Sequence, residues 1–333
     1  MRKTKTLILI FTTLLFTAFL SCNKTDDASG DNTDYRQEMR DFVMSISRYA
    51  KSINSNFLII PQNGQELVTA NGKGDGAPQA EYLASMDATG REDMFYGYVK
   101  DDEETPAEDR QFLLNLCQVC EQHGVEVLST DYCSTPGKMD NSYALNEQYG
   151  FISFAAPERS LDVIPVYPEK PFNENDSDIT QISQAKNFLY LINSENYTEK
   201  QDFVKAVSAT NYDLIIIDLF HNEAPFTTDE ISALKTKKSG SRRLVVCYMS
   251  IGEAEDYRYY WQPDWKPGNP SWLEKENPDW EGNYKVKYWD KGWQGIIFGN
   301  DGSYLNKILD VGFDGVYLDI IDAFEYFEES RKK

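Results

Sequence analysis

The sequence predicts an α/β protein of the (β/α)8 barrel class, and three observations support this prediction. The chain has 333 residues, of which 41% are apolar and 14% aromatic, enough for a large buried core. Eight short apolar runs with the character of strands alternate with helical segments along the chain. The glycine-rich motifs G-x-G-x-x-G and G-x-x-x-x-G-K-[ST] do not follow the expected first strands, so a doubly wound nucleotide fold has little support.

Residues 1–21 have the features of an export signal. They combine a basic start with an apolar run of roughly 14 residues, which is too short to span a bilayer. The run ends in F-L-S-C, which resembles the lipobox of bacterial lipoproteins and predicts lipid attachment at Cys22. Residues 22–34 are acidic and poor in apolar residues, as expected of a flexible tether. We therefore expect an exported protein, lipid-anchored to the outer membrane or cell surface; a plain secretory signal is the alternative.

The barrel is expected to occupy residues 35–333 as a single domain, and residues 35–165 supply its first four strands. Apolar residues at helical spacing predict a helix over 35–53. Further helices are expected between Pro106 and Gly124 and around residues 141–150. The predicted strands are 57–60, 81–90, 125–133 and 151–159.

The second half of the chain repeats this alternation after a linker. Residues 166–179 are rich in Pro, Asn, Asp and Glu and predict that linker. Helical segments are expected at 229–237 and 303–313. The remaining predicted strands are 187–193, 212–218, 242–253 and 315–321. A parallel strand at 315–321 needs a covering helix, and the chain has few residues left to form one.

Charge and cysteine content narrow the function classes. The net charge of -21 argues against a nucleic-acid partner, because phosphates would be repelled. It suits a cationic ligand, and equally a surface that is acidic for solubility. Cys117 and Cys120 form a C-x-x-C pair on the apolar face of an amphipathic helix, where small buried residues are expected. With Cys133, Cys247 and two histidines left, no second pair has metal-ligand spacing, so we predict neither a metal site nor a cofactor.

Carboxylates recur where the predicted strands end. In a barrel all strands are parallel, so their carboxyl ends meet at one rim. A single aspartate there would often be a helix cap, whereas five are expected to include a reactive group. The five are Asp87, Asp131, Asp218, Glu253 and Asp319.

A set of longer motifs carries a specific resemblance. The motifs are NFLYLIN, YDLIIIDLF, VVCYMSIGEAEDYRYYW, NYKVKYWDKGWQGIIF, GFDGVYLDIIDAFEYF, FLIIPQNG, REDMFY and LSTDYC. Together they resemble the glycoside hydrolase family 114-type barrels, in the branch of extracellular glycosidases once labelled cysteinyl-tRNA synthetase-like. The resemblance covers nearly everything from residue 35 onward and implies a TIM barrel that cleaves glycosidic bonds.

The order of these motifs differs from that of the family. Relatives begin with the block like NFLYLIN, whereas here that block occupies residues 180–329 and the family's later block occupies residues 35–165. The resemblance thus implies a circularly permuted barrel, in which the helix over 35–53 covers the strand at 315–321. Truncation of a longer protein is the alternative explanation.

The resemblance also implies which residues are catalytic. Asp218 and Asp319 match acidic positions of the family motifs, and Glu253 matches the glutamate of the GEAEDYR block. In the alternative view Glu253 pairs with Arg258 and only organises its loop. The polygalactosaminidase branch has a motif like D-G-[IV]-E-P-D-N, where this chain has Tyr317 in place of the glutamate. The motif therefore does not by itself imply a galactosaminide substrate.

Substrate-binding residues are expected at the same rim. All six tryptophans lie between Trp261 and Trp293, with several tyrosines, and two or three of these rings are expected to face the cleft and stack on sugars. Other polar and aromatic residues follow the strands and suit hydroxyl or amine recognition. The predicted substrate-binding residues are Tyr248, Tyr317, Gln62, Asn63, Glu92, Asp131, Tyr132 and Trp289.

These observations favour an exported glycoside hydrolase acting on an extracellular polysaccharide, with amino sugars among its candidate units. The alternative is a surface glycan-binding protein on a barrel that has lost catalysis. A metal-dependent deacetylase is disfavoured because this chain has few histidines to serve as metal ligands. A tRNA synthetase is disfavoured because the chain contains neither an H-I-G-H nor a K-M-S-K-S motif and its negative charge would repel tRNA.

Overall fold

The structure is a computed structural model that describes residues 32–332, and residues from Asp34 onward form one compact unit. The predicted export signal, Cys22 and most of the predicted tether lie outside the described residues. Among the helices that are described, none combines the length and the apolar character needed to cross a bilayer.

The strands form two parallel sheets. The larger one has the order β1-β13-β9-β6-β5, so the last strand of the chain is hydrogen-bonded to the first. The smaller one has the order β2-β3-β4. The bounds are β1 Leu58–Pro61, β2 Ala88–Glu92, β3 Glu126–Tyr132, β4 Ile152–Ala156, β5 Phe188–Tyr190, β6 Leu214–Ile217, β9 Leu244–Ser250 and β13 Gly315–Asp319.

Isolated parallel bridges link the two sheets at both ends. Gln62, just after β1, pairs with Gly90 of β2, and Ser153 of β4 pairs with Asn187, just before β5. The predicted mixture of helices and parallel strands is confirmed. Two small antiparallel sheets are inserted as well. One consists of β10 Glu253–Glu255, β12 Asn283–Val286 and β11 Leu273–Glu276, and the other of β7 Phe220–His221 and β8 Ala224–Pro225.

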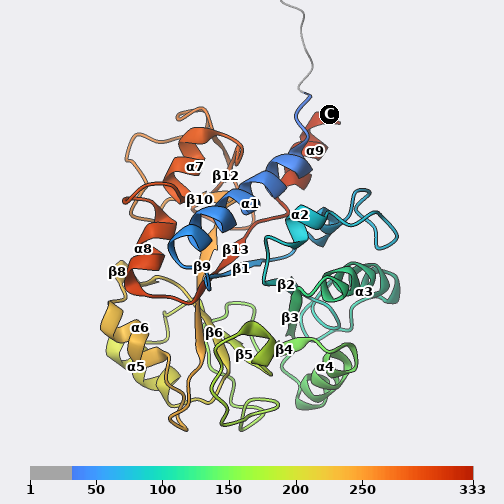
Figure 1. The fold of residues 1–333 in the computed structure, drawn as a ribbon, viewed down its shortest axis with the longest axis vertical. Helices are drawn as coiled ribbons and strands as arrows, with labels where there is room; N and C mark the ends of the chain where they lie inside the picture. Colours follow the sequence, from blue (N-terminus) through green and yellow to red (C-terminus); the bar gives the residue numbers. More distant parts are fainter. Residues whose placement is uncertain (1–31, 333) are drawn as a thin grey trace, which may run out of the picture. The chain divides into compact units, whose positions relative to one another are not determined.

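Helices separate the strands (Figure 1), in the alternation that the sequence predicts. The short elements η1 Gln65–Val68 and η2 Ile182–Gln184 are 3-10 helices. The α-helices are α1 Tyr35–Ile53, α2 Ala80–Leu83, α3 Ala107–Gln122, α4 Pro136–Tyr149, α5 Lys200–Ser208, α6 Thr228–Leu234, α7 Lys291–Ile297, α8 Tyr304–Val311 and α9 Ala323–Arg331.

The first helix, α1, packs against segments from the end of the chain. Asp34 caps it by accepting a hydrogen bond from the backbone N–H of Gln37. Arg36 donates two hydrogen bonds, at 2.8 and 3.1 Å, to the carboxylate of Glu328 on α9. Figure 1 shows α1 beside α9, in agreement with the contacts between these two helices, and the first strand β1 is paired with the last strand β13.

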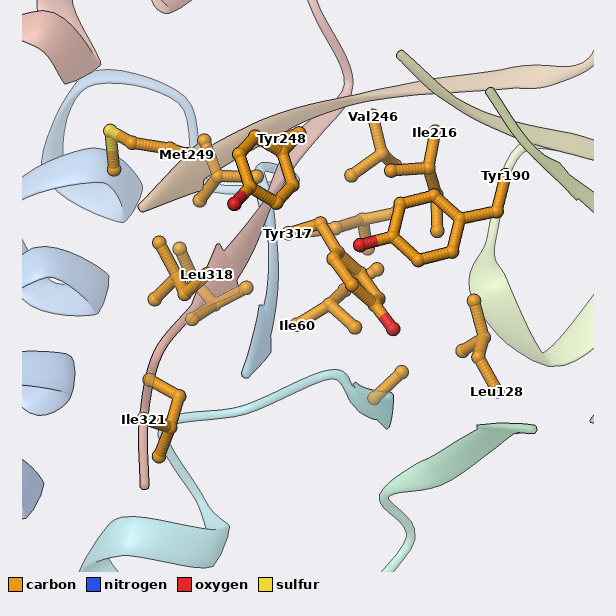
Figure 2. Close-up of a cluster of buried hydrophobic side chains, with 14 of the residues drawn as sticks. Ile60, Leu128, Tyr190, Ile216, Val246, Tyr248, Met249, Tyr317, Leu318 and Ile321 are labelled. Carbon is orange, nitrogen blue, oxygen red and sulfur yellow. The ribbon is translucent and has the colours of Figure 1, made fainter. Parts of the chain in front are cut away.

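The core is built from the facing side chains of the parallel strands. Figure 2 shows Ile60, Tyr190, Ile216, Val246 and Tyr317, from five different strands, meeting in the interior. All five are at most 2% exposed. Cys117 and Cys120 are free and buried, as predicted for the C-x-x-C pair, and so are Cys133 and Cys247.

Two details differ from the sequence-based expectation. Residues 80–83 form the helix α2, and β2 begins only at Ala88. Asp87 therefore lies at the amino end of β2, where its Oδ2 accepts a hydrogen bond from the backbone N–H of Ile59 at 2.8 Å and pairs with Lys51. The prediction that Asp87 joins the carboxylates at the carboxyl ends is wrong, because its role is to anchor the start of β1.

The predicted linker has no helix or strand but is held by a buried ion pair. Lys237 and Asp213 form that pair, and both side chains are fully buried. Lys237 also donates to the backbone carbonyls of Asn175 and Ser177, at 3.3 and 2.9 Å. Buried charges require such partners, so the segment is fixed to the amino end of β6.

Candidate active site

A cavity of about 630 Å³ lies at the carboxyl ends of the parallel strands. Its lining comes from both sheets, since it includes Gln62 after β1, Glu92 of β2, Tyr190 of β5 and Asp319 of β13. This volume suits a small ligand or part of a longer one. The expected gathering of polar groups at one rim is therefore present.

Most of the predicted site residues line this cavity. Among the candidate acids, Asp218 and Asp319 come to it from β6 and β13, and Glu253 comes from the start of β10. The predicted substrate-binding residues that line it are Gln62, Asn63, Glu92, Tyr132 and Tyr248.

Asp319 has the environment of a carboxylic acid that keeps its proton. Burial raises the pKa of Asp319 to about 8, and the negative charge of Glu92 acts in the same direction. The hydroxyl of Tyr248 lies 2.6 Å from Oδ2, and the backbone N–H of Ile320 donates to Oδ1 at 2.8 Å. Ile320 has a φ of 61°, an uncommon left-handed conformation for a β-branched residue. The strained residue thus helps to hold the carboxyl in place.

Glu92 accepts hydrogen bonds from neutral donors on both of its oxygens. The hydroxyl of Tyr132 donates to Oε1, and the side-chain amide of Asn63 donates to Oε2 at 2.9 Å. Burial raises the pKa of the Tyr132 hydroxyl well above its usual range, so this group stays a donor. Glu92 is therefore oriented without a cation.

Asp218 is fixed by an arginine. Arg258 donates to both of its oxygens, at 2.9 and 2.7 Å, and the backbone N–H of Phe220 donates to Oδ1 at 2.8 Å. The same guanidinium binds Glu255 at 2.7 Å. Bidentate pairs of this kind are strong and directional. The side chain of Arg258 is 8% exposed, so this triad forms a rigid, largely buried part of the cavity wall.

Glu253 pairs with Lys285 and not with Arg258, the partner that the sequence suggested. Its Oε1 accepts hydrogen bonds from Lys285 at 3.0 Å and Asn277 at 2.9 Å, whereas Arg258 pairs with Glu255. Glu253 is 1% exposed, and within the described residues its Oε2 has no hydrogen-bond partner. The suggested pairing of Glu253 with Arg258 is wrong, although an organising role for Glu253 fits its contacts.

Three predicted residues do not line the cavity. Asp131 is fully buried and accepts hydrogen bonds from the backbone N–H groups of Phe95 and Tyr96, so it shapes the loop after β2. Trp289 packs 4.7 Å from the ring of Phe327 on α9. Their contacts indicate packing roles, since Asp131 is buried and paired with the backbone and Trp289 is partly buried against α9.

Tyr317, the third, is fully buried among the strands. Its ring lies 5.1 Å from that of Tyr190, as Figure 2 shows. The interior has room for it because residue 90 is glycine, where a Cβ atom would lie 1.9 Å from the Tyr317 hydroxyl. The hydroxyl of Tyr190 donates a hydrogen bond at 3.0 Å to Oε1 of Gln62, which lines the cavity. Tyr317 thus supports the floor of the cavity.

The cavity also includes residues that were not predicted. Asp322 lines it, and burial raises the pKa of this carboxyl to about 6. Trp280 and Tyr257 line it as well, which confirms the expectation that two or three rings of the aromatic segment face the cleft. A signal for Asp322 was its place three residues after Asp319. Across residues 32–332 no cluster of three metal-ligating side chains was found.

Comparison with known proteins agrees with this geometry. Residues 169–332, which include β5 to β13 and therefore Asp218, Glu253 and Asp319, match the model of glycoside-hydrolase family GH114. The predicted resemblance to this family is confirmed for these residues.

Three similar curated proteins are uncharacterized. One, from Methanocaldococcus jannaschii, is 41% identical over 160 residues, which make up 47% of this chain and 42% of the relative. Another, from Deinococcus radiodurans, is 40% identical over 126 residues, 38% of each chain. A third, from Thermotoga maritima, is 38% identical over 144 residues, 43% of this chain and 41% of the relative. The chain thus spans about two fifths of the length of these relatives.

Proposed function

We propose that this GH114 protein is an exported, lipid-anchored endo-glycosidase that hydrolyses an extracellular polysaccharide containing amino sugars. The observation that carries the proposal is Asp319, a carboxylic acid with a raised pKa in a large polar cavity. Export and anchoring rest on the sequence of residues 1–34 and on Cys22, which lie largely outside the described part of the chain.

The two parallel sheets form one closed barrel in this proposal. The support is that β1 pairs with β13, and that single parallel bridges join Gln62 to Gly90 and Ser153 to Asn187. The barrel is circularly permuted relative to its family. Contacts of α1 with the end of the chain, such as the pair of Arg36 with Glu328, favour this arrangement.

Asp319 acts as the general acid. Glycosidic bond cleavage needs a protonated carboxyl beside the leaving oxygen and a second, ionised carboxylate. A pKa of about 8 keeps Asp319 protonated at neutral pH. On cleavage the proton passes from Asp319 to the glycosidic oxygen as the bond to the anomeric carbon breaks.

Glu92 is the second carboxylate. It raises the pKa of Asp319 through its charge, so the two groups are coupled, as expected of an acid with its ionised partner. Its hydrogen bonds come from Tyr132 and Asn63, which leave its charge unneutralised by a cation. It serves as nucleophile in a retaining reaction or as base toward water in an inverting one.

Asp218 and Glu253 then have supporting roles. Both oxygens of Asp218 are bound by Arg258, and a lone pair engaged by a guanidinium is a poor nucleophile. Glu253 holds Lys285 and Asn277. Both carboxylates remain part of the substrate-binding wall.

The charge of the cavity favours an amino-sugar unit in the substrate. Seven of its lining residues are acidic, namely Glu92, Glu195, Asp218, Glu253, Glu255, Asp319 and Asp322, whereas Arg159 and Arg258 are the basic ones. Both arginines are already paired, Arg159 with Asp93 and Asp101. Asp218, Glu253 and Glu255 have cationic partners and Asp319 holds its proton at neutral pH. The acids that would attract an ammonium group on the ligand are therefore Glu92, Glu195 and Asp322.

A non-catalytic glycan-binding protein is the second candidate, and one observation favours it. Tyr317 stands where the resemblance implies a family glutamate, and it is fully buried with no partner for its hydroxyl within the described residues. If that glutamate is essential for catalysis in the family, this chain binds glycans without cleaving them.

Product analysis on a panel of polysaccharides separates the two candidates. The panel holds partially de-N-acetylated amino-sugar polymers and common neutral glycans, and the products are sized by chromatography and mass spectrometry. We expect cleavage by the wild type, loss of at least about a hundredfold in Asp319→Asn and Glu92→Gln, and full activity in Asp310→Asn, an exposed aspartate on α8. Binding without cleavage by the wild type would favour the second candidate, and undiminished cleavage by Asp319→Asn would refute the assignment of the acid.

A further inference from the structure

The segment between β9 and α8 contains all six tryptophans, and most of them have an evident packing role. Trp293, for example, is fully buried and donates from Nε1 to the carbonyl of Ile251 at 2.8 Å. Ring contacts account for the others. They are Trp261 with Tyr284 at 4.9 Å, Trp265 with Trp272 at 4.9 Å, Trp272 with Trp293 at 5.2 Å and Trp289 with Phe327 at 4.7 Å.

Trp280 is different from these five. It is 58% exposed, it lines the cavity, and within residues 32–332 it makes no ring contact and its indole N–H donates no hydrogen bond. Exposing a large apolar ring to water has a free-energy cost that packing alone would remove. An exposed indole in a cavity wall, without an aromatic neighbour among the described residues, therefore points to a ligand that covers it.

Tyr257 lines the same cavity and is 59% exposed. Its hydroxyl is fixed at both sides, since it lies 2.7 Å from Oε1 of Glu255 and 3.3 Å from Oδ1 of Asn283. The guanidinium of Arg258 lies 5.1 Å from its ring centroid. The ring of Tyr257 is thus held in place beside Asn283, the first residue of β12, which follows Trp280 by three residues.

The turn that carries Trp280 is well defined by hydrogen bonds. The backbone N–H of Trp280 donates to Asn277, and the N–H of Asn283 donates to Trp280, at 3.3 and 3.1 Å. The side-chain amide of Asn277 donates in turn to Glu253 at 2.9 Å. Glu253 is buried in the cavity wall, so it links the turn to the site.

Glu253 supplies the second, independent observation. Its Oε2 is buried and has no partner within the described residues, although an ionised carboxylate oxygen needs donors. A donor from a ligand, either a hydroxyl or an ammonium group, would satisfy it. Glu253 and Trp280 are connected through Asn277, which donates a hydrogen bond to Glu253 and accepts one from the backbone N–H of Trp280.

We propose that Trp280 and Tyr257 form a sugar-binding subsite, in which Trp280 stacks on the apolar face of a pyranose ring and Glu253 accepts a hydrogen bond from a polar group at the edge of that ring. The inference rests on the proposed glycan ligand but not on catalysis. The subsite adds a binding position to the one beside Asp319 and Glu92. The protein therefore holds more than one unit of its polysaccharide, which suits cleavage inside a chain.

The test measures binding in the Asp319→Asn protein, so that turnover does not interfere. Tryptophan fluorescence is titrated with soluble oligosaccharides of partially de-N-acetylated chitosan and of cellulose, each containing about six units, and calorimetry gives the Kd. In this background we compare Trp280→Ala, Trp280→Phe and the control Phe112→Ala, which removes an exposed ring of α3 outside the cavity.

We expect Trp280→Ala to raise the Kd about tenfold or more, which corresponds to about 1.4 kcal/mol, because the stacking contact and the apolar area that it buries are both lost. Trp280→Phe should bind within about threefold of its parent and lose most of the fluorescence change, since the responding indole is gone. Phe112→Ala should match the parent in both respects. Circular dichroism checks that each variant is folded.

Two results would overturn the subsite. One is an unchanged Kd in folded Trp280→Ala, and the other is the absence of binding to every oligosaccharide by the parent protein. Failure of the proposed function is read from a separate measurement, namely cleavage by the wild type that does not depend on Asp319. A glycan-binding protein without hydrolase activity would still show the loss in Trp280→Ala.

Discussion

Replacing Asp319 by asparagine is expected to abolish cleavage and, at the same time, to remove a pH-dependent loss of stability. The native state holds the proton of Asp319 up to a pKa of about 8, whereas an unfolded chain releases it near the ordinary value of 3.8. Between these values the unfolded state binds fewer protons, so the free energy of unfolding falls as pH rises. The asparagine side chain has no such titration, and its amide can satisfy both Tyr248 and the N–H of Ile320.

The size of the effect follows from the same two values. The difference of about four pH units, at ~1.4 kcal/mol per unit, sets an upper limit near 6 kcal/mol for the stability lost between about pH 4 and pH 8. Asp319 keeps some access to solvent, which reduces this value, so we expect about 2 kcal/mol.

Urea unfolding at pH 5, 7 and 9 measures this difference directly. The quantity compared is the free energy of unfolding of Asp319→Asn minus that of the wild type, which cancels the titration of all other groups to first order. We expect this difference to increase by about 2 kcal/mol from pH 5 to pH 9. Asp310→Asn, at an exposed site on α8, should give a difference that does not change with pH.

A difference that stays constant from pH 5 to pH 9 would refute the reasoning. It would mean that Asp319 is already ionised at pH 5, and that it cannot be the general acid at neutral pH. A difference that decreases with pH would mean that the surroundings of Asp319 stabilise its ionised carboxylate.

Three further predictions test other parts of the account. Glu92→Gln should lower kcat, and it should move the basic limb of residual activity to lower pH, because the charge of Glu92 raises the pKa of Asp319; an unmoved limb in the pH profile would contradict the coupling. Lys237→Met should destabilise the protein by about 3–5 kcal/mol, since it leaves the buried carboxylate of Asp213 unpaired; thermal unfolding should show partial recovery when Asp213→Asn is added. Tyr317→Phe should leave kcat and KM unchanged and unfold at the same or a higher temperature, because the lost hydroxyl has no partner in residues 32–332; a raised KM would restore Tyr317 to the substrate-binding residues.

Local patterns were sufficient to predict the elements that bring acids to the cavity. The runs L-I-I-I-D and G-V-Y-L-D are apolar strands that end in a carboxylate, and Asp218 and Asp319 both line the cavity as expected. The same reasoning was wrong for Asp87, because the residues before it form α2 and the strand begins after it. A strand of five residues with one apolar face gives a weak signal for its own start.

The roles of the acids depended on contacts that local patterns do not contain. Arg258, which binds Asp218, lies forty residues away in the chain, and Tyr132 lies forty residues from its acceptor Glu92. The position of Tyr317 is one that the alternation of side chains along a strand could have predicted. Residues two apart on a strand share a face, so Tyr317 lies below Asp319 and points into the same interior. That Tyr317 packs in the core and does not contact a ligand depends on Gly90 of another strand, which leaves room for its ring.

The distribution of cations around the cavity is the strongest argument for where the chemistry occurs. Arg258 pairs with Asp218 and Glu255, and Lys285 pairs with Glu253, so each of these three carboxylates has a cationic partner. Within the described residues, by contrast, Glu92, Asp319 and Asp322 form no ion pair.

Burial is the first cause that raises the pKa of Asp319 to about 8 and that of Asp322 to about 6, and the negative charge of Glu92 acts in the same direction on both. The charges of Arg91 and Lys285 act in the opposite direction on Asp322 without pairing with it in the described part of the chain. A cation placed among these carboxyl groups would stabilise the fold and remove the acid. The arrangement therefore gives up some stability to keep one proton available, and a substrate carrying an ammonium group would restore part of it on binding.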